Sequence, residues 1–276
     1  DIAINIDYFS RSNTWFILFS LNSKLLPLSS VSSIRFYWYS SPQIIVDYNP
    51  YEITTKRRAL VLFKTDWLGA YGKHPIKTGT TQFEASEAAH ILNKLGYLVT
   101  IINRSHKEKL RYDYDLFYGL VIGGSGKYFD YYYNQMPQNS IKIALSTGPN
   151  DAVTKKKFQD RLDYFNERHG ITLNLPSRAL YNHHNEIIRK CDALFYHGNT
   201  VVIEGYNNFK IPKYKLPTPI KDTIKINFQT LEQKYKFRNN FLFYSGGGVM
   251  TKGLDIIIDA FLDLPDFNLF IATLSH

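Results

Sequence analysis

The sequence Ala-Leu-Val-Leu-Phe at residues 59–63 and the sequence Tyr-Leu-Val-Thr-Ile-Ile at residues 97–102 bracket the part of the chain that best indicates its fold class. A short run that is apolar throughout is typical of a strand covered on both faces of a sheet. Between the two runs, apolar residues recur at spacings of three and four, and Gly96 stands where a helix would end. These apolar positions are Phe83, Ala85, Ala88, Ala89, Leu92 and Leu95. Strand, helix and strand in this order predict a parallel sheet.

The same alternation continues along the chain. Further strands are expected at 116–122, 141–145 and 191–196, and helices at 128–136 and 151–169. A proline-rich stretch at 210–220 is extended and resembles an exit from a domain. A second series then starts, with a strand at 241–244, a helix from about residue 251 and a strand at 267–272. The pattern predicts an α/β protein with two successive domains of this kind.

We therefore divide the chain into four parts. Residues 1–57 form a serine- and tyrosine-rich extension of unclear role, with short strand-like pieces. Residues 58–220 form the first domain, 221–240 a basic linker, and 241–276 the start of the second domain. Because 36 residues cannot cover both faces of a parallel sheet, we expect the chain to be a piece of a longer protein.

Composition narrows the class of protein only slightly. The chain has 276 residues, 44% of them apolar, which excludes wholesale disorder, and its one cysteine excludes an internal disulfide. The net charge of +9 would suit nucleic acid, an anionic membrane surface or a phosphorylated substrate. It is spread along the chain, whereas nucleic-acid binders usually concentrate basic residues on one element, so nucleic acid is not an expected partner.

Two glycine-rich junctions between a strand and a helix could hold phosphate. The first, Gly123–Lys127, fails the P-loop pattern because Val121 and Tyr128 occupy two of its required positions. The segment Gly123–Lys127 is equally well explained as a tight turn between a strand and a helix, with no ligand. The second, Ser-Gly-Gly-Gly-Val-Met-Thr-Lys-Gly at 245–253, fails both the dinucleotide and the P-loop patterns. It still combines a glycine-rich loop, a lysine in the first helical turn and a helix dipole, which diphosphate recognition requires.

Residues 244–261, Tyr-Ser-Gly-Gly-Gly-Val-Met-Thr-Lys-Gly-Leu-Asp-Ile-Ile-Ile-Asp-Ala-Phe, resemble the donor-binding segment of group 1 glycosyltransferases (family four). Residues 80–85 with 91–97 resemble the first helix of those enzymes. Cys-Asp-Ala at 191–193 with Gly-Asn at 198–199 is similar to a stretch late in their first domain. The resemblance covers about residues 58–276. It implies a GT-B fold, in which two Rossmann-like domains share a nucleotide-sugar site.

The resemblance also implies roles for particular residues. Lys252 would contact the donor diphosphate, and the backbone of Gly246, Gly247 and Gly248 would approach it. A cation there would stabilise the charge that grows on the leaving nucleoside diphosphate. Gly79, Thr80, Thr147 and Asn150 would line the cleft from the first domain. The implied reaction transfers a sugar from a UDP- or GDP-linked donor to a glycan, lipid-linked or other acceptor, with retention of configuration and without a required metal or other cofactor.

The chain departs from the family pattern in three ways. Gly247 stands where many members have an arginine, and 146–150 lack the histidine that many place there. The paired glutamates that bind the donor would lie beyond residue 276, and no catalytic residue can be assigned. A non-catalytic or degenerate GT-B module that binds a partner or a glycan therefore remains an alternative.

Three smaller expectations complete the interpretation. His183 and His184 are adjacent, so on a helix they would point apart, and no acidic cluster nearby completes a metal site. No run of the chain approaches the 18 apolar residues of a spanning helix. The resemblance to group 1 glycosyltransferases implies a cytoplasmic protein, because such enzymes often work at the cytoplasmic membrane surface. The basic segment 221–240 would suit peripheral contact with anionic lipid.

Overall fold

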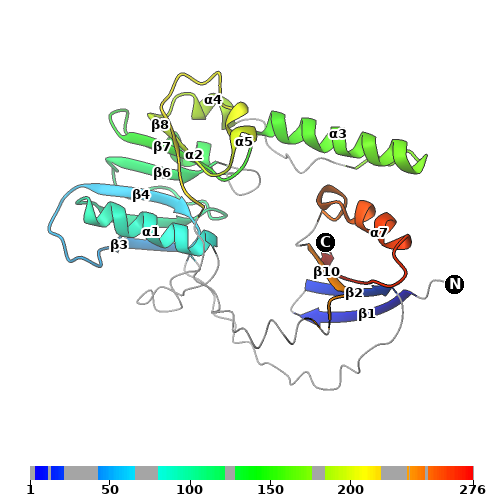
Figure 1. Ribbon diagram of the computed structural model, residues 1–276. Coiled ribbons are helices and arrows are strands. Elements are labelled where there is room, and N and C mark those ends of the chain that lie inside the picture. Colours follow the sequence, from blue (N-terminus) through cyan, green and yellow to red (C-terminus); the bar gives the residue numbers. More distant parts are fainter. Residues whose placement is uncertain are drawn as a thin grey trace. The chain divides into compact units, whose positions relative to one another are not determined.

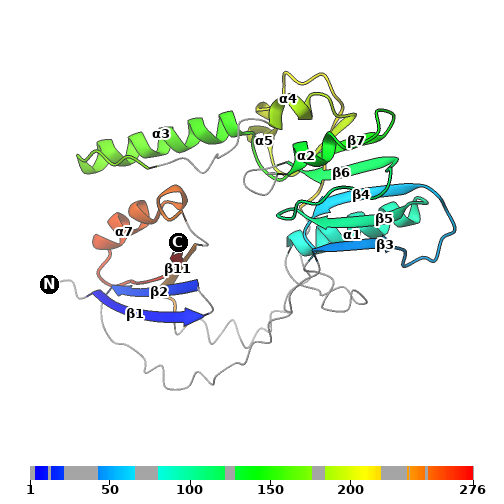
Figure 2. The same ribbon diagram turned by 180° about the vertical axis from the view of Figure 1, so that it is seen from behind.

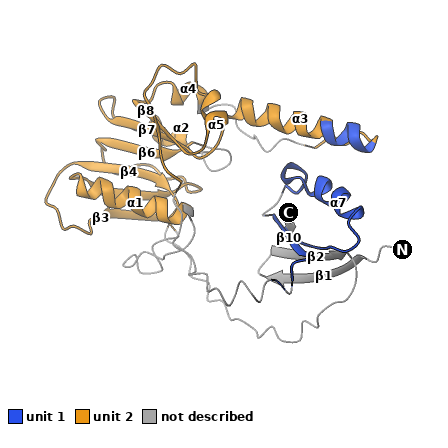
Figure 3. Cartoon of the chain, viewed as in Figure 1, with its two compact units in different colours: residues 1–35, 164–169, 223–276 blue, residues 36–163, 170–222 orange. Residues whose placement is uncertain are grey.

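The computed structural model describes residues 4–11, 14–21, 43–65, 80–121, 128–175, 184–218, 235, 237–245 and 248–275. The chain divides into two compact units (Figure 3). Unit 1 consists of residues 1–35, 164–169 and 223–276, and unit 2 of residues 36–163 and 170–222.

Unit 2 is built on a seven-stranded sheet in the order β3-β5-β4-β6-β7-β8-β9 (Figures 1 and 2). The strands are β3 (Ile44–Tyr48), β4 (Arg58–Phe63), β5 (Leu98–Asn103), β6 (Leu116–Leu120), β7 (Ile141–Ser146), β8 (Ala193–Tyr196) and β9 (Lys213–Lys215). All neighbouring pairs are parallel except β3 with β5, which is antiparallel. The predicted α/β class with a mostly parallel sheet is confirmed, and this order is compatible with a Rossmann-like fold.

Strand β4 shows why the sheet is buried on both faces. Its side chains alternate, so that Val61 and Phe63 join the core on one face while Leu60 and Leu62 join the core on the other. All four are fully buried. A strand whose two faces both pack against helices has no position for a polar side chain, which explains the continuous apolar run.

The helices of unit 2 are α1 (Thr80–Lys94), α2 (Phe129–Tyr133), α4 (His184–Ile188), α5 (Thr200–Glu204) and residues 151–163 of α3 (Asp151–His169). Residues 164–169 of α3 belong to unit 1. Helix α1 packs on β4 and β5 through Ala85, Ala89 and Leu92, at helical spacing. The opposite core contains Phe129 of α2 and Ile188 of α4.

Gly119 of β6 allows this second face to close. A Cβ atom at Gly119 would lie 2.7 Å from the Phe129 ring and 2.8 Å from the Phe117 ring. Both rings are fully buried, and neither has room to shift. Only glycine fits where α2 approaches the sheet so closely.

Unit 1 contains a four-stranded sheet in the order β1-β2-β11-β10. Its strands are β1 (Ile4–Arg11), β2 (Thr14–Leu21), β10 (Asn240–Ser245) and β11 (Asn268–Ser275). Strands β10 and β11 are parallel and are linked through the 3-10 turn η2 (Met250–Lys252) and helix α7 (Leu254–Leu262). Strand β2 pairs antiparallel with β11, so the N-terminal hairpin extends the sheet of the C-terminal segment.

The helices and strands of the structure agree with some of the elements expected from the sequence and differ from others. The helix expected at 151–169 is confirmed, and so is the unit of two strands, expected at 59–63 and 97–102, with a helix between them. The structure has these strands at 58–63 and 98–103. The apolar face expected for α1 is wrong in part: Ala85 and Leu92 are buried, but Phe83 and Leu95 are exposed. Strand β3 was not expected, and the loop at 123–127 lies outside the described residues.

Candidate functional site

The glycine-rich segment of unit 1 lies between β10 and α7. Gly246 and Gly247 fall outside the described residues, whereas Gly248 has a left-handed backbone with φ of 66°. Gly253, at the start of α7, also has a positive φ of 80°. L-residues rarely adopt this conformation, so two glycines shape the turn that leads into the helix.

Lys252 lies in η2 with an exposed side chain. Its backbone N–H donates to the carbonyl oxygens of Gly248 and Val249, both at 3.2 Å. The N–H groups of Gly253 and Leu254 also donate to backbone carbonyls. What this turn presents to a ligand is therefore the Lys252 ammonium group rather than these amides.

The residues expected to line the cleft have different environments. Gly79 lies outside the described residues, and Thr80 begins α1. Thr147 is exposed just after β7. Asn150 is buried: its side-chain oxygen accepts from the Val153 N–H at 3.0 Å, and its amide donates to the Gly205 carbonyl. Asn150 thus caps α3 and joins the start of that helix to the end of α5.

The structure brings together two residues that the sequence interpretation did not single out, Glu84 and His197. Glu84 lies in the early part of α1, and His197 directly follows β8. The His197 Nε2 atom and the Glu84 Oε1 atom form a hydrogen-bonded ion pair. The Glu84 side chain is 13% exposed and the His197 side chain 9% exposed. A buried acid–base pair is a recognised mark of a functional site, although ion pairs with only a structural role can look the same.

Local sequence explains how His197 is held. Its backbone N–H donates to the Ser146 carbonyl at 2.9 Å, which continues the pairing of β7 and β8. Gly198 then turns the chain with φ of 116°, and the side chain of Asn199 caps α5 by accepting from the Val201 N–H. His197 shares a sheet face with Phe195, two residues earlier, and this is the face on which α1 packs.

Burial dominates the electrostatics of this pair. Burial raises the pKa of Glu84 above its ordinary value, and the contact with His197 opposes that rise. Burial also raises the pKa of Tyr118 in β6, and the charge on Glu84 raises it further. The Nδ1 atom of His197 is enclosed and has no hydrogen-bond partner among the described residues.

Glu84 and His197 lie at one end of an apolar groove beside α1. The groove has a volume of about 460 Å³ and runs between α1 and strands β6, β7 and β8. Its lining includes Ile91, Tyr118, Ile143, Phe195 and Leu216. Because α1 begins and β8 ends at the carboxyl edge of the sheet, the ion pair lies at the edge where open α/β sheets bind ligands.

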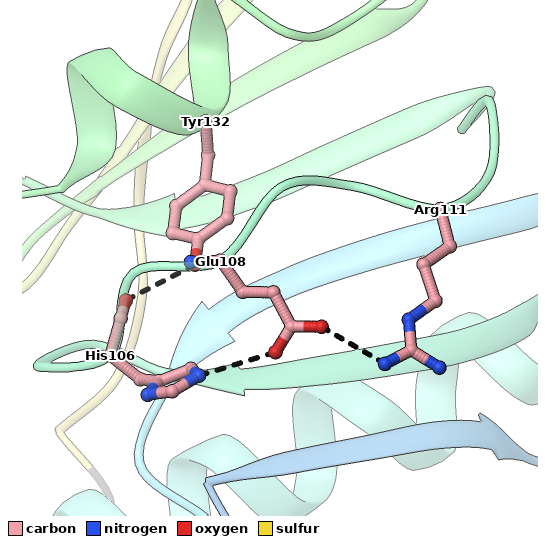
Figure 4. Close-up of polar contacts among 4 residues, drawn as sticks. All are labelled: His106, Glu108, Arg111 and Tyr132. Atoms are coloured by element: carbon pink, nitrogen blue, oxygen red, sulfur yellow. Dashed lines mark hydrogen bonds and ion pairs between the residues drawn. The ribbon is translucent and has the colours of Figure 1, made fainter.

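A second polar cluster lies on the loop after β5 (Figure 4). Glu108 pairs with His106 at 3.3 Å and with Arg111 at 3.2 Å. The Tyr132 hydroxyl accepts from the Glu108 N–H at 3.0 Å and donates to the His106 carbonyl at 3.1 Å. The two hydrogen bonds of the Tyr132 hydroxyl hold the loop against α2. Since the Glu108 and Arg111 side chains are 32% and 75% exposed, we interpret the cluster as structural.

The part of the chain that the structure describes holds no candidate metal site and no helix that could span a membrane. There, no group of three or more histidine, cysteine, aspartate or glutamate side chains could hold a metal ion. His184 starts α4, and His183 lies outside the described residues. No helix within the described ranges combines the length and apolar character that crossing a bilayer requires.

Comparison with protein-family models, curated proteins and solved structures found no match to this chain. The likeness to group 1 glycosyltransferases therefore stands on the residues quoted from the sequence.

Sequence reasoning missed Glu84 and His197 because they are separated by 113 residues. One local signal was available. His197 follows a short apolar strand and precedes a glycine, which places it at the carboxyl edge of a parallel sheet. Its partner could not be chosen in the same way, because Glu84 and Glu87 are both acidic residues of α1.

Proposed function

We propose that this chain comes from a glycosyltransferase of GT-B architecture. The reaction would transfer a hexosyl group from a UDP- or GDP-linked donor to a glycan, lipid-linked or other acceptor. The observation that carries the proposal is the parallel strand–turn–helix–strand unit β10–η2–α7–β11, with left-handed Gly248 and exposed Lys252 at the turn.

The chemistry assigned to this turn is electrostatic. A nucleoside diphosphate leaves with additional negative charge, and a cation held beside it lowers the barrier. The Lys252 side chain has no acidic partner among the described residues, so its charge is available to an anion. Gly246, Gly247 and Gly248 would supply the close backbone approach. The cytoplasmic location and any contact of segment 221–240 with anionic lipid belong to the same proposal.

The experiment is a calorimetric titration of the whole chain with UDP and with GDP. We expect saturable binding of one of them, and Lys252→Ala should weaken it about 10- to 150-fold, the value of one charge-assisted hydrogen bond. Lys157→Ala is the matched control, because Lys157 is also an exposed helical lysine. Absence of nucleotide binding, or equal affinity in the Lys252→Ala variant, would contradict the proposal.

A non-catalytic module that binds a partner is the second candidate. It is favoured by the exposed apolar side chains of β10, among them Leu242 and Tyr244. This candidate predicts that neither nucleotide binds, so the same titration separates it from the glycosyltransferase.

A further inference from the structure

Strand β10 forms one edge of the sheet of unit 1. It pairs with β11 on one side, and among the described residues no strand pairs with it on the other. Leu242 and Tyr244 of this strand are 67% and 68% exposed. An edge strand presents a row of unpaired backbone N–H and C=O groups, to which another strand can add. The sheet of unit 1 is therefore open to extension at β10.

The other edge strands of the two sheets carry features that hinder such pairing. In β3 the register with β5 shifts between Ile45 and Tyr48, where Asp47 has a left-handed backbone with φ of 53°. Strand β9 reads Lys-Tyr-Lys, and the sequence of β1 contains an aspartate and an arginine. Strand β10 reads Asn-Phe-Leu-Phe-Tyr-Ser, without charge, proline or a register shift against β11. Because bulges and charged residues are the usual means of blocking an edge, β10 is the edge most open to pairing.

The ladder with β11 shows which backbone groups of β10 face outward. The Asn239 carbonyl accepts from the Asn268 N–H at 2.8 Å, so the odd-numbered residues of this strand direct their backbone groups toward β11. The even-numbered residues direct theirs away. The Asn240 N–H already donates to a carbonyl in the preceding turn at 2.9 Å. The outward N–H and C=O groups of Leu242 and Tyr244 remain for a partner strand.

A second copy of β10 satisfies these groups in an antiparallel pair. When Leu242 of one copy lies opposite Tyr244 of the other, each of these residues donates its N–H to the carbonyl of the residue opposite. Pairings centred nearer the start of the strand would place the occupied Asn240 N–H opposite an acceptor. The strand has no charged residue, so two chains of net charge +9 meet here without like charges opposite each other.

We infer that the chain forms a two-fold dimer in which the β10 strands of two copies pair antiparallel, with Leu242 opposite Tyr244, and join their two sheets into one. The partner is a second copy because the same strand supplies matching donors, acceptors and apolar side chains to itself. The pairing also brings together the two most exposed apolar residues of β10. The inference concerns unit 1 alone and does not depend on glycosyl transfer.

The first test is the mass of the whole chain by analytical ultracentrifugation at rising concentration. A single chain has a mass of 32.1 kDa. We expect the average mass to rise toward twice this value between about 1 and 200 µM, the range in which micromolar affinities are visible. A mass that stays at that of one chain would overturn the inference. No nucleotide is present, so this result and the titration with UDP and GDP are separate.

Three variants locate the interface. Leu242→Pro removes an outward N–H and none of those that bond to β11, which an edge strand tolerates, and it should keep the chain monomeric. Leu242→Lys should weaken the dimer about 10-fold or more, because a charge replaces an apolar contact in each copy. The matched control is Leu95→Lys in unit 2, where Leu95 is 62% exposed, and it should leave the dimer unchanged. If Leu95→Lys prevents association, or if both Leu242 variants dimerise like the unaltered chain, the inference is wrong.

Disulfide formation tests the register. Opposite residues that exchange hydrogen bonds have Cα atoms about 5.5 Å apart, within the range of about 4.4–6.8 Å that a disulfide spans. The native Cys191 is buried and should not react. A mixture of Leu242→Cys and Tyr244→Cys chains should therefore cross-link about 10-fold faster than either variant alone, whose thiols are offset by two residues, about 7 Å along the strand. Equal rates in the three preparations, or no cross-link in the mixture, would contradict the proposed pairing.

Discussion

Strands β4 and β10 have six residues each and both are largely apolar, yet their surroundings differ. Strand β4 reads Arg-Ala-Leu-Val-Leu-Phe and is buried from its second residue onward. Strand β10 reads Asn-Phe-Leu-Phe-Tyr-Ser, and Leu242 and Tyr244 are 67% and 68% exposed. β4 lies inside a seven-stranded sheet with a core on each face, whereas β10 is the edge of a four-stranded sheet. An apolar run therefore predicts a strand but not its burial, which depends on the layers that cover it.

The largest expected difference comes from truncating one leucine in each strand. Leu60→Ala should cost about 2–5 kcal/mol in the free energy of unfolding of unit 2, because Leu60 is fully buried. Leu242→Ala should cost less than about 0.5 kcal/mol. If the two variants lose the same free energy of unfolding, the difference in burial between β4 and β10 has no effect on stability.

Cys191 gives a measurement that reports on unit 2 alone. It is the single cysteine, it is buried in the core of unit 2, and burial raises its pKa to about 12. A disulfide reagent such as DTNB should therefore react only when unit 2 opens. Leu60→Ala should speed labelling by roughly 30-fold to several thousand-fold, the factor that corresponds to 2–5 kcal/mol, and Leu242→Ala should leave the rate unchanged.

An intermediate effect is expected at Asn150, which links two helices inside unit 2. Asn150→Ala removes the cap of α3 and leaves the Gly205 carbonyl without its donor, so we expect a loss of about 1–3 kcal/mol. The control is Asn199→Ala, where an exposed asparagine caps the five-residue helix α5 and the loss should be at most about 1 kcal/mol. Chemical denaturation measures both. If Asn150→Ala leaves stability unchanged, its hydrogen bonds do not hold the fold.

The smallest expected effect is a pH dependence from Glu84. Its raised pKa means that the folded chain holds the proton to higher pH than the unfolded chain. Protonated Glu84 therefore contributes to the free energy of unfolding. This contribution is fully present below the ordinary glutamate pKa of 4.5 and is lost as the pH rises through the pKa of Glu84 in the folded chain. The free energy of unfolding of the unaltered chain, minus that of Glu84→Gln, should therefore fall from about pH 4.5 upward. Parallel stability curves for the two proteins would show that Glu84 has an ordinary pKa.

Much of the fold was predictable because its signals are local. The alternation of apolar runs and helical periods predicted the α/β class, and the helix at 151–169 matches α3 residue for residue. The pairing of β2 with β11 was not predictable, because it joins positions about 250 residues apart that carry no local mark of each other. The same limit applies to the apolar period at the end of α1, which did not distinguish Leu92, which is buried, from Leu95, which is 62% exposed.

The amino-acid sequence by itself determined the strands, the helices and the positions of glycine-rich turns, because backbone preference and apolar period act within a few residues. Only the tertiary structure decided which apolar side chains are buried and which line a groove. It also decided that Glu84 meets His197, since a parallel sheet aligns the ends of strands that are far apart in the chain. The glycine-rich turn with Lys252 could be read from the sequence, whereas the apolar groove beside α1 exists only in the fold.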